Sequence, residues 1–207
     1  MMAATGCAFK ANYNPSYFGS NTTTYESKIP GVAAIEASDD VKNETFTSSP
    51  TSFTGGGTKL TLPVGEIVTQ AALLSFRDIF SGGAEIIEPG KYTSSHSVIV
   101  KPKFRSMTYE YNQLKNLGFA VTPTASVSIE LNVEGLTKKS IVNEIYESGA
   151  VESEAYFATA SPGDEISKAF HKAVIGIARK SADSVHKSIS KTGDVEGRVK
   201  ILKDDEL

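Results

Sequence analysis

Hydrophobic and polar residues alternate from Phe119 to Val133, and this is the clearest pattern in the chain. The odd positions hold apolar residues, alanine and proline, whereas the even positions after Ala120 hold Thr, Ser, Glu and Asn. A period of two places one set of side chains on a core and the other in water. The pattern therefore predicts a long half-buried strand. Residues 112–118 before it are few enough to form the connection of an antiparallel hairpin.

The preceding segment, residues 97–111, is the expected partner strand of that hairpin. Val98, Val100, Pro102 and Phe104 fall on one of its faces. The three basic residues Lys101, Lys103 and Arg105 fall on the other, until Met107, Tyr109 and Tyr111 replace them at the odd positions. We interpret these basic residues as a possible interaction face, the alternative being ordinary solvated side chains. Because proline cannot donate to a sheet ladder, Pro102 and Pro123 are expected at an edge, a bulge or a bend.

Two helices complete the pattern. Apolar residues at helical spacing predict a helix over about 64–80, ended by Ser81-Gly82-Gly83. Ser161 and Pro162 have the residue types of an N-cap and first helical position, and Gly193 marks the end of the helix that they begin. Short strands are expected at residues 29–35 and 84–88, a third meander strand at 139–147, and a final strand at 195–202.

These elements predict an α/β (α+β) fold. The expected sheet is mixed and mainly antiparallel, with a long β-meander and two principal helices packed on it. We expect one domain over residues 29–203, preceded by a flexible segment at 1–28 and followed by a charged tail at 204–207. The composition fits such a domain, because 40% of the 207 residues are hydrophobic.

Charge and apolar content exclude several classes of protein. A formal net charge of -3 gives no positive field for nucleic acid. No apolar run approaches the roughly 18 residues that cross a bilayer. Cys7 is the single cysteine, which excludes a disulfide framework. The terminal Lys203-Asp204-Asp205-Glu206-Leu207 is similar to an endoplasmic-reticulum retention signal, but Asp204 stands where that signal has lysine, and chance similarity is the better explanation.

Cys7 itself is the most informative residue near the start of the chain. Ala4-Thr5-Gly6-Cys7 resembles the lipobox of bacterial lipoproteins, in which small residues precede a cysteine that is acylated after cleavage; Ala4 departs from the usual leucine. The resemblance implies acylation of Cys7, with palmitate a typical chain, and the loss of a signal peptide. The alternative is an ordinary free thiol. Residues 11–28 are rich in Asn, Ser, Thr, Gly and Tyr, which suits a flexible spacer behind a lipid anchor.

The sequence contains little that points to catalysis. His96, His171 and His186 are not at the spacing of metal ligands, and we interpret each as a polar-face or loop residue. Gly55-Gly56-Gly57-Thr58-Lys59 lacks the order of a phosphate-binding loop, and no nucleophile elbow is present. We therefore expect no metal site, no cofactor and no enzymatic activity.

The order of the elements resembles the α/β domain of small outer-membrane lipoproteins of the PelC and YajG families, and is similar to the amino-terminal domain of TolB. The features that carry this resemblance are residues 29–35, the helix from Val64, the meander over 97–147 and the helix from Ser161. It implies a periplasmic protein without an active site that binds other envelope proteins and sometimes forms rings. Only Cys7 can be carried over as a functional residue.

The expected function is therefore that of a structural or assembly lipoprotein on the periplasmic face of the bacterial outer membrane. Its complex would be of the secretion, motility or polysaccharide-export type. The expected partners are envelope proteins, further copies of the chain and, through the acyl group, the membrane; nucleic acid is not among them. A periplasmic module that binds a small molecule or a glycan is the alternative, and an enzyme with dispersed catalytic residues is a third hypothesis.

Overall fold

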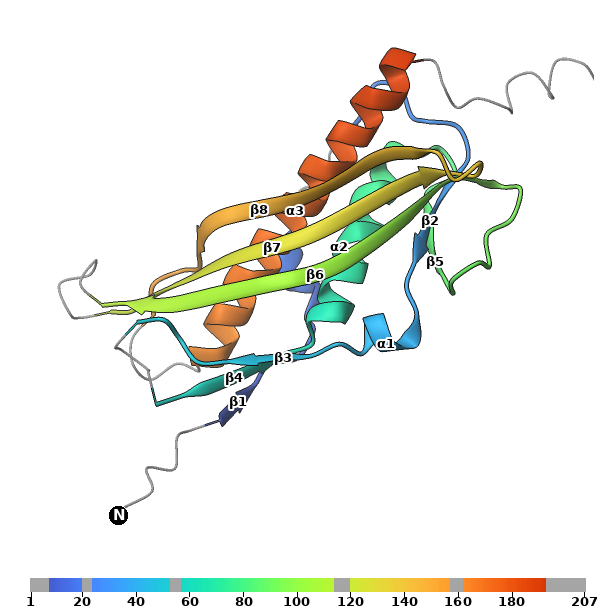
Figure 1. Cartoon of the computed structure of the whole chain (residues 1–207). Helices are drawn as coiled ribbons and strands as arrows, with labels where there is room; N and C mark the ends of the chain where they lie inside the picture. Colours follow the sequence, from blue (N-terminus) through green and yellow to red (C-terminus); the bar gives the residue numbers. More distant parts are fainter. Residues whose placement is uncertain (1–7, 20–23, 53–56, 114–119, 157–161, 193–207) are drawn as a thin grey trace, which may run out of the picture.

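The computed structural model describes residues 8–19, 24–52, 57–113, 120–156 and 162–192. Its centre is a five-stranded sheet with the strand order β5-β2-β6-β7-β8, and a three-stranded sheet of order β1-β4-β3 lies beside it (Figure 1). The elements along the chain are β1 (Ala8–Lys10), η1 (Pro15–Phe18), β2 (Val32–Glu36), α1 (Asp39–Lys42), β3 (Phe46–Ser48), β4 (Lys59–Leu62), α2 (Val64–Ile79), β5 (Ala84–Ile87), β6 (His96–Asn112), β7 (Thr122–Gly135), β8 (Ser140–Glu152) and α3 (Pro162–Thr192). The predicted mixed α+β fold is confirmed.

The antiparallel meander β6–β7–β8 forms the larger part of the main sheet. The hairpin register runs from the Val98–Gly135 pair to the Asn112–Thr122 pair. β2 is parallel to both of its neighbours, and its pairing with β6 ends at Val100. Pro102 therefore lies on the part of β6 that faces no strand on that side, which satisfies the expectation that its missing N–H avoids a ladder.

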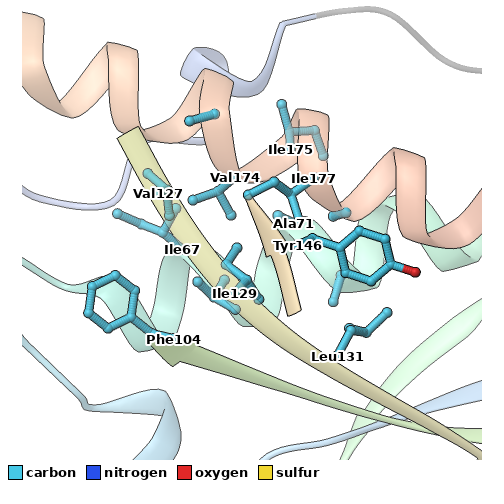
Figure 2. Close-up of a cluster of buried hydrophobic side chains, with 14 of the residues drawn as sticks. Ile67, Ala71, Phe104, Val127, Ile129, Leu131, Tyr146, Val174, Ile175 and Ile177 are labelled. Atoms are coloured by element: carbon cyan, nitrogen blue, oxygen red, sulfur yellow. The ribbon is translucent and has the colours of Figure 1, made fainter. Parts of the chain in front are cut away.

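Both long helices pack on one face of the main sheet, and the core lies between these two layers. The odd residues of β7 point into it, so that Val127, Ile129 and Leu131 are buried. Figure 2 shows them packed with side chains of both long helices and of the neighbouring strands. The residues labelled beside them are Ile67 and Ala71 of α2, Phe104 of β6, Tyr146 of β8, and Val174, Ile175 and Ile177 of α3. The period-two and helical patterns of the sequence thus supply the two sides of one core.

A bulge in β6 explains a change in the pattern of that strand. The register with β7 shifts between Phe104 and Ser106, so Arg105 is an extra residue. Before the bulge the even positions of β6 face the helices, and after it the odd positions Met107 and Tyr109 do. The extra residue reverses the alternation and so places Met107 and Tyr109 on the same face as Val98, Val100 and Phe104.

The structure corrects the interpretation of residues 11–28 as a flexible spacer. Within the described part, Ala11 and Phe18 are buried in the core, and η1 contacts α3. The neighbouring residues Ala8–Lys10 form β1, which pairs with β4. The polar composition led to the wrong prediction because only a few apolar and aromatic side chains hold this segment on the core. These side chains do not recur with a regular period. Cys7, the tail at 204–207 and the strand expected at 195–202 lie outside the described residues.

Other boundaries differ less. α3 begins at Pro162 and ends at Thr192, as the cap residues predict. The third meander strand is longer than expected and reaches Glu152. The three strands of the small sheet, β1, β3 and β4, were not predicted, because strands of 3 or 4 residues carry too little periodicity.

Candidate functional site: the open face of the sheet

The face of the main sheet that is turned away from α2 and α3 is the candidate site, and we call it the open face. No described helix packs on β6, β7 and β8 from this side, which faces the viewer in Figure 1. Its side chains are half-buried or exposed and mostly polar. They include Lys101, Lys103 and Arg105 on β6, Ser126, Ser128, Glu130, Asn132 and Glu134 on β7, and Asn143, Ile145 and Glu147 on β8.

The structure places the three predicted basic residues together on this face, and two of them form ion pairs. The Lys101 Nζ atom lies 2.8 Å from a carboxylate oxygen of Glu134, and Arg105 contacts the carboxylate of Glu130. The hydrogen bond to Glu134 raises the pKa of Lys101, and the same bond lowers the pKa of Glu134. These glutamates occupy even positions of β7 across the hairpin. Their pairing with the basic residues follows from the register rather than from either strand alone.

Lys103 differs from its two neighbours. It is exposed and, within the described part of the chain, forms no ion pair. The basic stripe of the sequence is thus a nearly neutral surface on which one ammonium group remains available. This arrangement favours local, directional contacts over attraction to a strongly charged polymer.

A shallow hollow of about 450 Å³ lies on the open face beside the end of β2. Its walls combine the three basic residues with carboxylates, an amide and a few apolar side chains; the lining residues are Glu36, Ser38, Val41, Pro89, Lys101, Pro102, Lys103, Arg105, Glu130 and Asn132. Asn132 donates from Nδ2 to Glu134 at 2.9 Å, and its buried Oδ1 atom accepts no hydrogen bond in the described structure. The hollow therefore offers groups of both charges and both hydrogen-bonding polarities.

The outer strand β8 adds an apolar residue and a strand edge. Ile145 has 60% of its surface exposed, an unusual value for a large aliphatic side chain, and it lies directly across from Glu130. Among the described strands β8 pairs only with β7, so its other edge carries unpaired backbone groups. A register shift near Gly149 bends this edge, and the Ser148 hydroxyl accepts the Val127 N–H at 3.0 Å there. An edge of this kind can accept a partner strand along its regular half.

The histidines do not form a site, and two of them are not the surface residues that the sequence suggested. His171 is fully buried on α3, in contact with the rings of Tyr13, Tyr17, Phe18 and Phe170. Its Nδ1–H donates to the Ser167 carbonyl at 2.7 Å, and its Nε2 accepts the backbone N–H of Asn14 at 3.3 Å. Burial lowers the pKa of His171 to about 4. It holds the N-terminal segment on α3, and the aromatic residues 13, 17 and 18 were the signal that could have shown this.

His96 is also buried, with 1% of its surface exposed. Its Nδ1 accepts the Thr93 N–H at 2.8 Å, so the hydrogen on Nε2 is donated to Glu85 at 2.7 Å. These bonds fix the turn between β5 and β6. Within the described residues no three potential ligands from His, Cys, Asp and Glu gather as a metal site would require.

Comparisons with known proteins give structural likeness without sequence similarity. No family model and no curated protein matches the chain. A DUF330 protein from Xanthomonas campestris matches 90% of this chain and 98% of its own, with 8% identity and a TM-score of 0.49. A candidate lipoprotein from Caulobacter crescentus matches 61% and 83%, with 9% identity and a TM-score of 0.37.

A third similar structure is a candidate homologue of neuraminyllactose-binding hemagglutinin from Helicobacter pylori. It matches 84% of this chain and 91% of its own, with 11% identity and a TM-score of 0.40. With TM-scores below 0.5, these three likenesses carry no argument about function. None of them tests the resemblance to the PelC and YajG families or to the TolB amino-terminal domain, which stays a prediction. In the described part of the chain, every helix is too short or too polar to span a bilayer.

Proposed function

We propose that this protein is a non-catalytic lipoprotein of the bacterial cell envelope. It is attached through an acyl group on Cys7 and serves as a structural or assembly subunit on the periplasmic face of the outer membrane. The observation that carries the proposal is the open face. One side of the sheet packs both helices, whereas the other presents a continuous, mostly polar surface of three long strands.

The composition of the open face suits a protein partner. Its core combines exposed Ile145 with the available ammonium group of Lys103, and paired charges surround them. Interfaces of non-obligate complexes have this mixture of an apolar contact and a polar rim. The β8 edge adds backbone groups that a neighbouring strand can pair with, including a strand from a second copy of this chain. Envelope proteins and further copies are therefore the proposed partners.

The folded N-terminal segment limits where such a partner can be. With β1 starting at Ala8, directly after Cys7, there is no long spacer between the acylated residue and the body of the protein. The described residues 8–19 therefore do not give the reach of a flexible segment. Partners would meet this protein close to the membrane surface.

Photo-crosslinking in intact cells tests the partner surface. A benzophenone amino acid at Asn143, on the open face, should give discrete crosslinked products, whereas the same group at the exposed Lys180 of α3 should not. The added variant Ile145→Arg should abolish the products of Asn143 without lowering the amount of folded protein. Equal crosslinking from both positions, or products that Ile145→Arg leaves intact, would exclude the open face as the docking surface.

Two further measurements address the anchor and self-association. Intact mass spectrometry of the protein from its native membranes should show acyl chains on Cys7, and an unmodified thiol would refute the lipoprotein assignment. Size-exclusion chromatography with light scattering should show a molecular mass above the 22.1 kDa of the monomer, and this mass should depend on protein concentration. A monomer at all concentrations would remove the homo-oligomer from the proposal and leave only foreign partners.

The hollow beside β2 supports a second candidate function, a module that binds a small polar ligand or a glycan. The supporting observation is the combination of Lys103 with the unpartnered Asn132 Oδ1 atom in a space of about 450 Å³. A thermal-shift screen should then find a ligand class that stabilises the protein saturably and fails to stabilise Lys103→Gln. If no acidic or neutral sugar in the screen gives a saturable shift in melting temperature, the binding of these sugars is excluded as the function.

A further inference from the structure

The outer face of the small sheet is the second distinctive surface of the molecule. Its strands alternate in the same way as the meander, so that Phe9, Leu60 and Leu62 pack towards the core. Phe46 and Ser48 of β3 lie on the same side as Leu62 and Leu60. The other side chains of the three strands point outward, and we call this outer surface the lysine face. It consists of Ala8 and Lys10 on β1, Lys59 and Thr61 on β4, and Thr47 on β3, which the register places side by side.

The charge of the lysine face is uniform. Lys10 and Lys59 are the charged residues of its three strands, and these strands contain no carboxylate. Both lysines are exposed and, within the described structure, neither forms an ion pair. By contrast, Lys42, Lys101 and Lys168 each hold a glutamate. The lysine face therefore carries two neighbouring ammonium groups without counter-charges, surrounded by small and hydroxyl-bearing side chains. Such a surface is complementary in charge to a flat surface of anionic oxygen atoms.

The position of the lysine face next to Cys7 in the sequence identifies the anionic surface that it would contact. Ala8 lies across from Lys59 in the parallel register, and Lys10 follows two residues later. Cys7 directly precedes Ala8 in the sequence, and consecutive Cα atoms are about 3.8 Å apart. An acyl chain on Cys7 must therefore enter the bilayer next to both ammonium groups. This step rests on the proposed acylation.

We propose that the lysine face lies on the membrane and that Lys10 and Lys59 contact the headgroups of anionic phospholipids. The body is then held in one orientation instead of turning freely about its acyl chain. α3 begins against the inner side of the small sheet, behind the lysine face. A Cβ atom added at Gly163 would lie only 3.2 Å from the Cβ atom of Phe9. The helix runs away from it over 31 residues, which is about 45 Å along its axis. In Figure 1 its last turns lie at the opposite end of the molecule from β1, the end that would be remote from the bilayer.

The orientation can be measured on the acylated full-length protein in vesicles. Because Cys7 is the only cysteine and its sulfur carries the acyl chain, a cysteine introduced elsewhere can be labelled uniquely. A fluorophore at Thr47→Cys should be quenched strongly by nitroxide-labelled headgroups in phosphatidylglycerol vesicles. The same fluorophore at Lys187→Cys, near the far end of α3, should be quenched little. Equal quenching, or stronger quenching at Lys187→Cys, would overturn the inference.

The role of the two lysines is tested with matched charge variants. One lysine near an anionic surface contributes about a fivefold change in membrane partitioning, so Lys10→Gln with Lys59→Gln should weaken binding of the acylated protein to phosphatidylglycerol vesicles roughly 30-fold. Binding to phosphatidylcholine vesicles should not change. The control pair Lys180→Gln and Lys187→Gln, two exposed lysines of α3, should bind both vesicles like the wild type.

The outcomes separate the two proposals. Intact mass spectrometry of each preparation reports whether Cys7 is acylated. An unmodified Cys7 in protein from native membranes would refute the proposed function, together with the orientation that rests on it. An acylated protein whose variants all bind phosphatidylglycerol equally would refute the contact of the lysines with lipid while leaving the lipoprotein assignment intact.

Discussion

The buried His171 makes stability depend on pH in a way that the structure specifies. Both imidazole nitrogens are engaged, since Nδ1 donates to Ser167 and Nε2 accepts from Asn14. A proton added at Nε2 would remove the acceptor of the Asn14 N–H and place a charge among aromatic rings. This environment disfavours the imidazolium form, and burial accordingly lowers the pKa of His171 from 6.5 to about 4. Acidification should therefore loosen the contact between the N-terminal segment and α3.

The magnitude follows from proton linkage. In the unfolded chain the imidazole binds a proton near pH 6.5, whereas in the folded protein it does so near pH 4. Between these values the unfolded state holds more protons, so the free energy of unfolding falls as the pH falls. The contribution of His171 is fully present above about pH 7 and is lost through this window. The expected loss is about 2 kcal/mol at pH 5 and about 3 kcal/mol below pH 4.

Urea unfolding of the wild type and of His171→Gln at pH 8 and pH 5 isolates this effect. Glutamine keeps a polar side chain on the helix but does not titrate in this range. The variant should be less stable at pH 8 because it loses the ring contacts. The difference between the two proteins should shrink by about 2 kcal/mol at pH 5. A difference that is the same at both pH values would refute the assignment of the neutral, buried imidazole, as would an NMR titration of His171 near pH 6.5.

Four other substitutions test packing and hydrogen bonding, each by its shift in the urea midpoint. Gly65→Ala should destabilise the protein by more than about 2 kcal/mol, because the added Cβ would lie 1.8 Å from the Val41 carbonyl oxygen. Gly176→Ala should instead stabilise it by about 0.5–1 kcal/mol, because the Cβ added there would have no heavy atom within 4 Å. Thr69→Val should stabilise by about 1 kcal/mol because the buried Thr69 hydroxyl has no partner, and a loss of stability would contradict that reading. Tyr25→Phe should cost about 1–2 kcal/mol, since it removes the hydrogen bond that Tyr25 donates to Asp183 on α3, and an unchanged midpoint would show that this contact contributes nothing.

The meander and the helices could be predicted because each has one buried face over many residues. β7 alternates over 14 residues, and a one-residue slip would expose its whole apolar set, so the register leaves a clear trace in the sequence. The bulge at Arg105 was also visible in principle. Apolar residues move from even positions up to Phe104 to odd positions from Met107, and a parity change inside one strand indicates an extra residue.

The candidate site was predicted only in part, because its properties depend on pairs of strands. Lys101, Lys103 and Arg105 were found as a stripe, but the near neutrality of that stripe comes from Glu130 and Glu134 across the hairpin. The strand that holds these glutamates has no basic residue to suggest a partner. The register places Lys103 directly across from Glu130, but Arg105 holds that carboxylate, so only the side-chain contacts show which lysine stays available. Single-strand patterns predict faces, and cross-strand neighbours decide their charge.

The N-terminal segment shows how far composition can mislead about function. Its Asn, Ser, Thr and Gly residues are those of a linker, yet Ala11 and Phe18 are buried and Tyr13 stacks on His171. A few buried apolar side chains are enough to order a segment that also gains strand pairing in β1, although they leave no periodic signal. If Cys7 carries an acyl chain, ordered residues follow the lipid anchor directly, in place of a long flexible spacer. The lysine face, and not the length of a spacer, then determines which surface the protein offers to its partners.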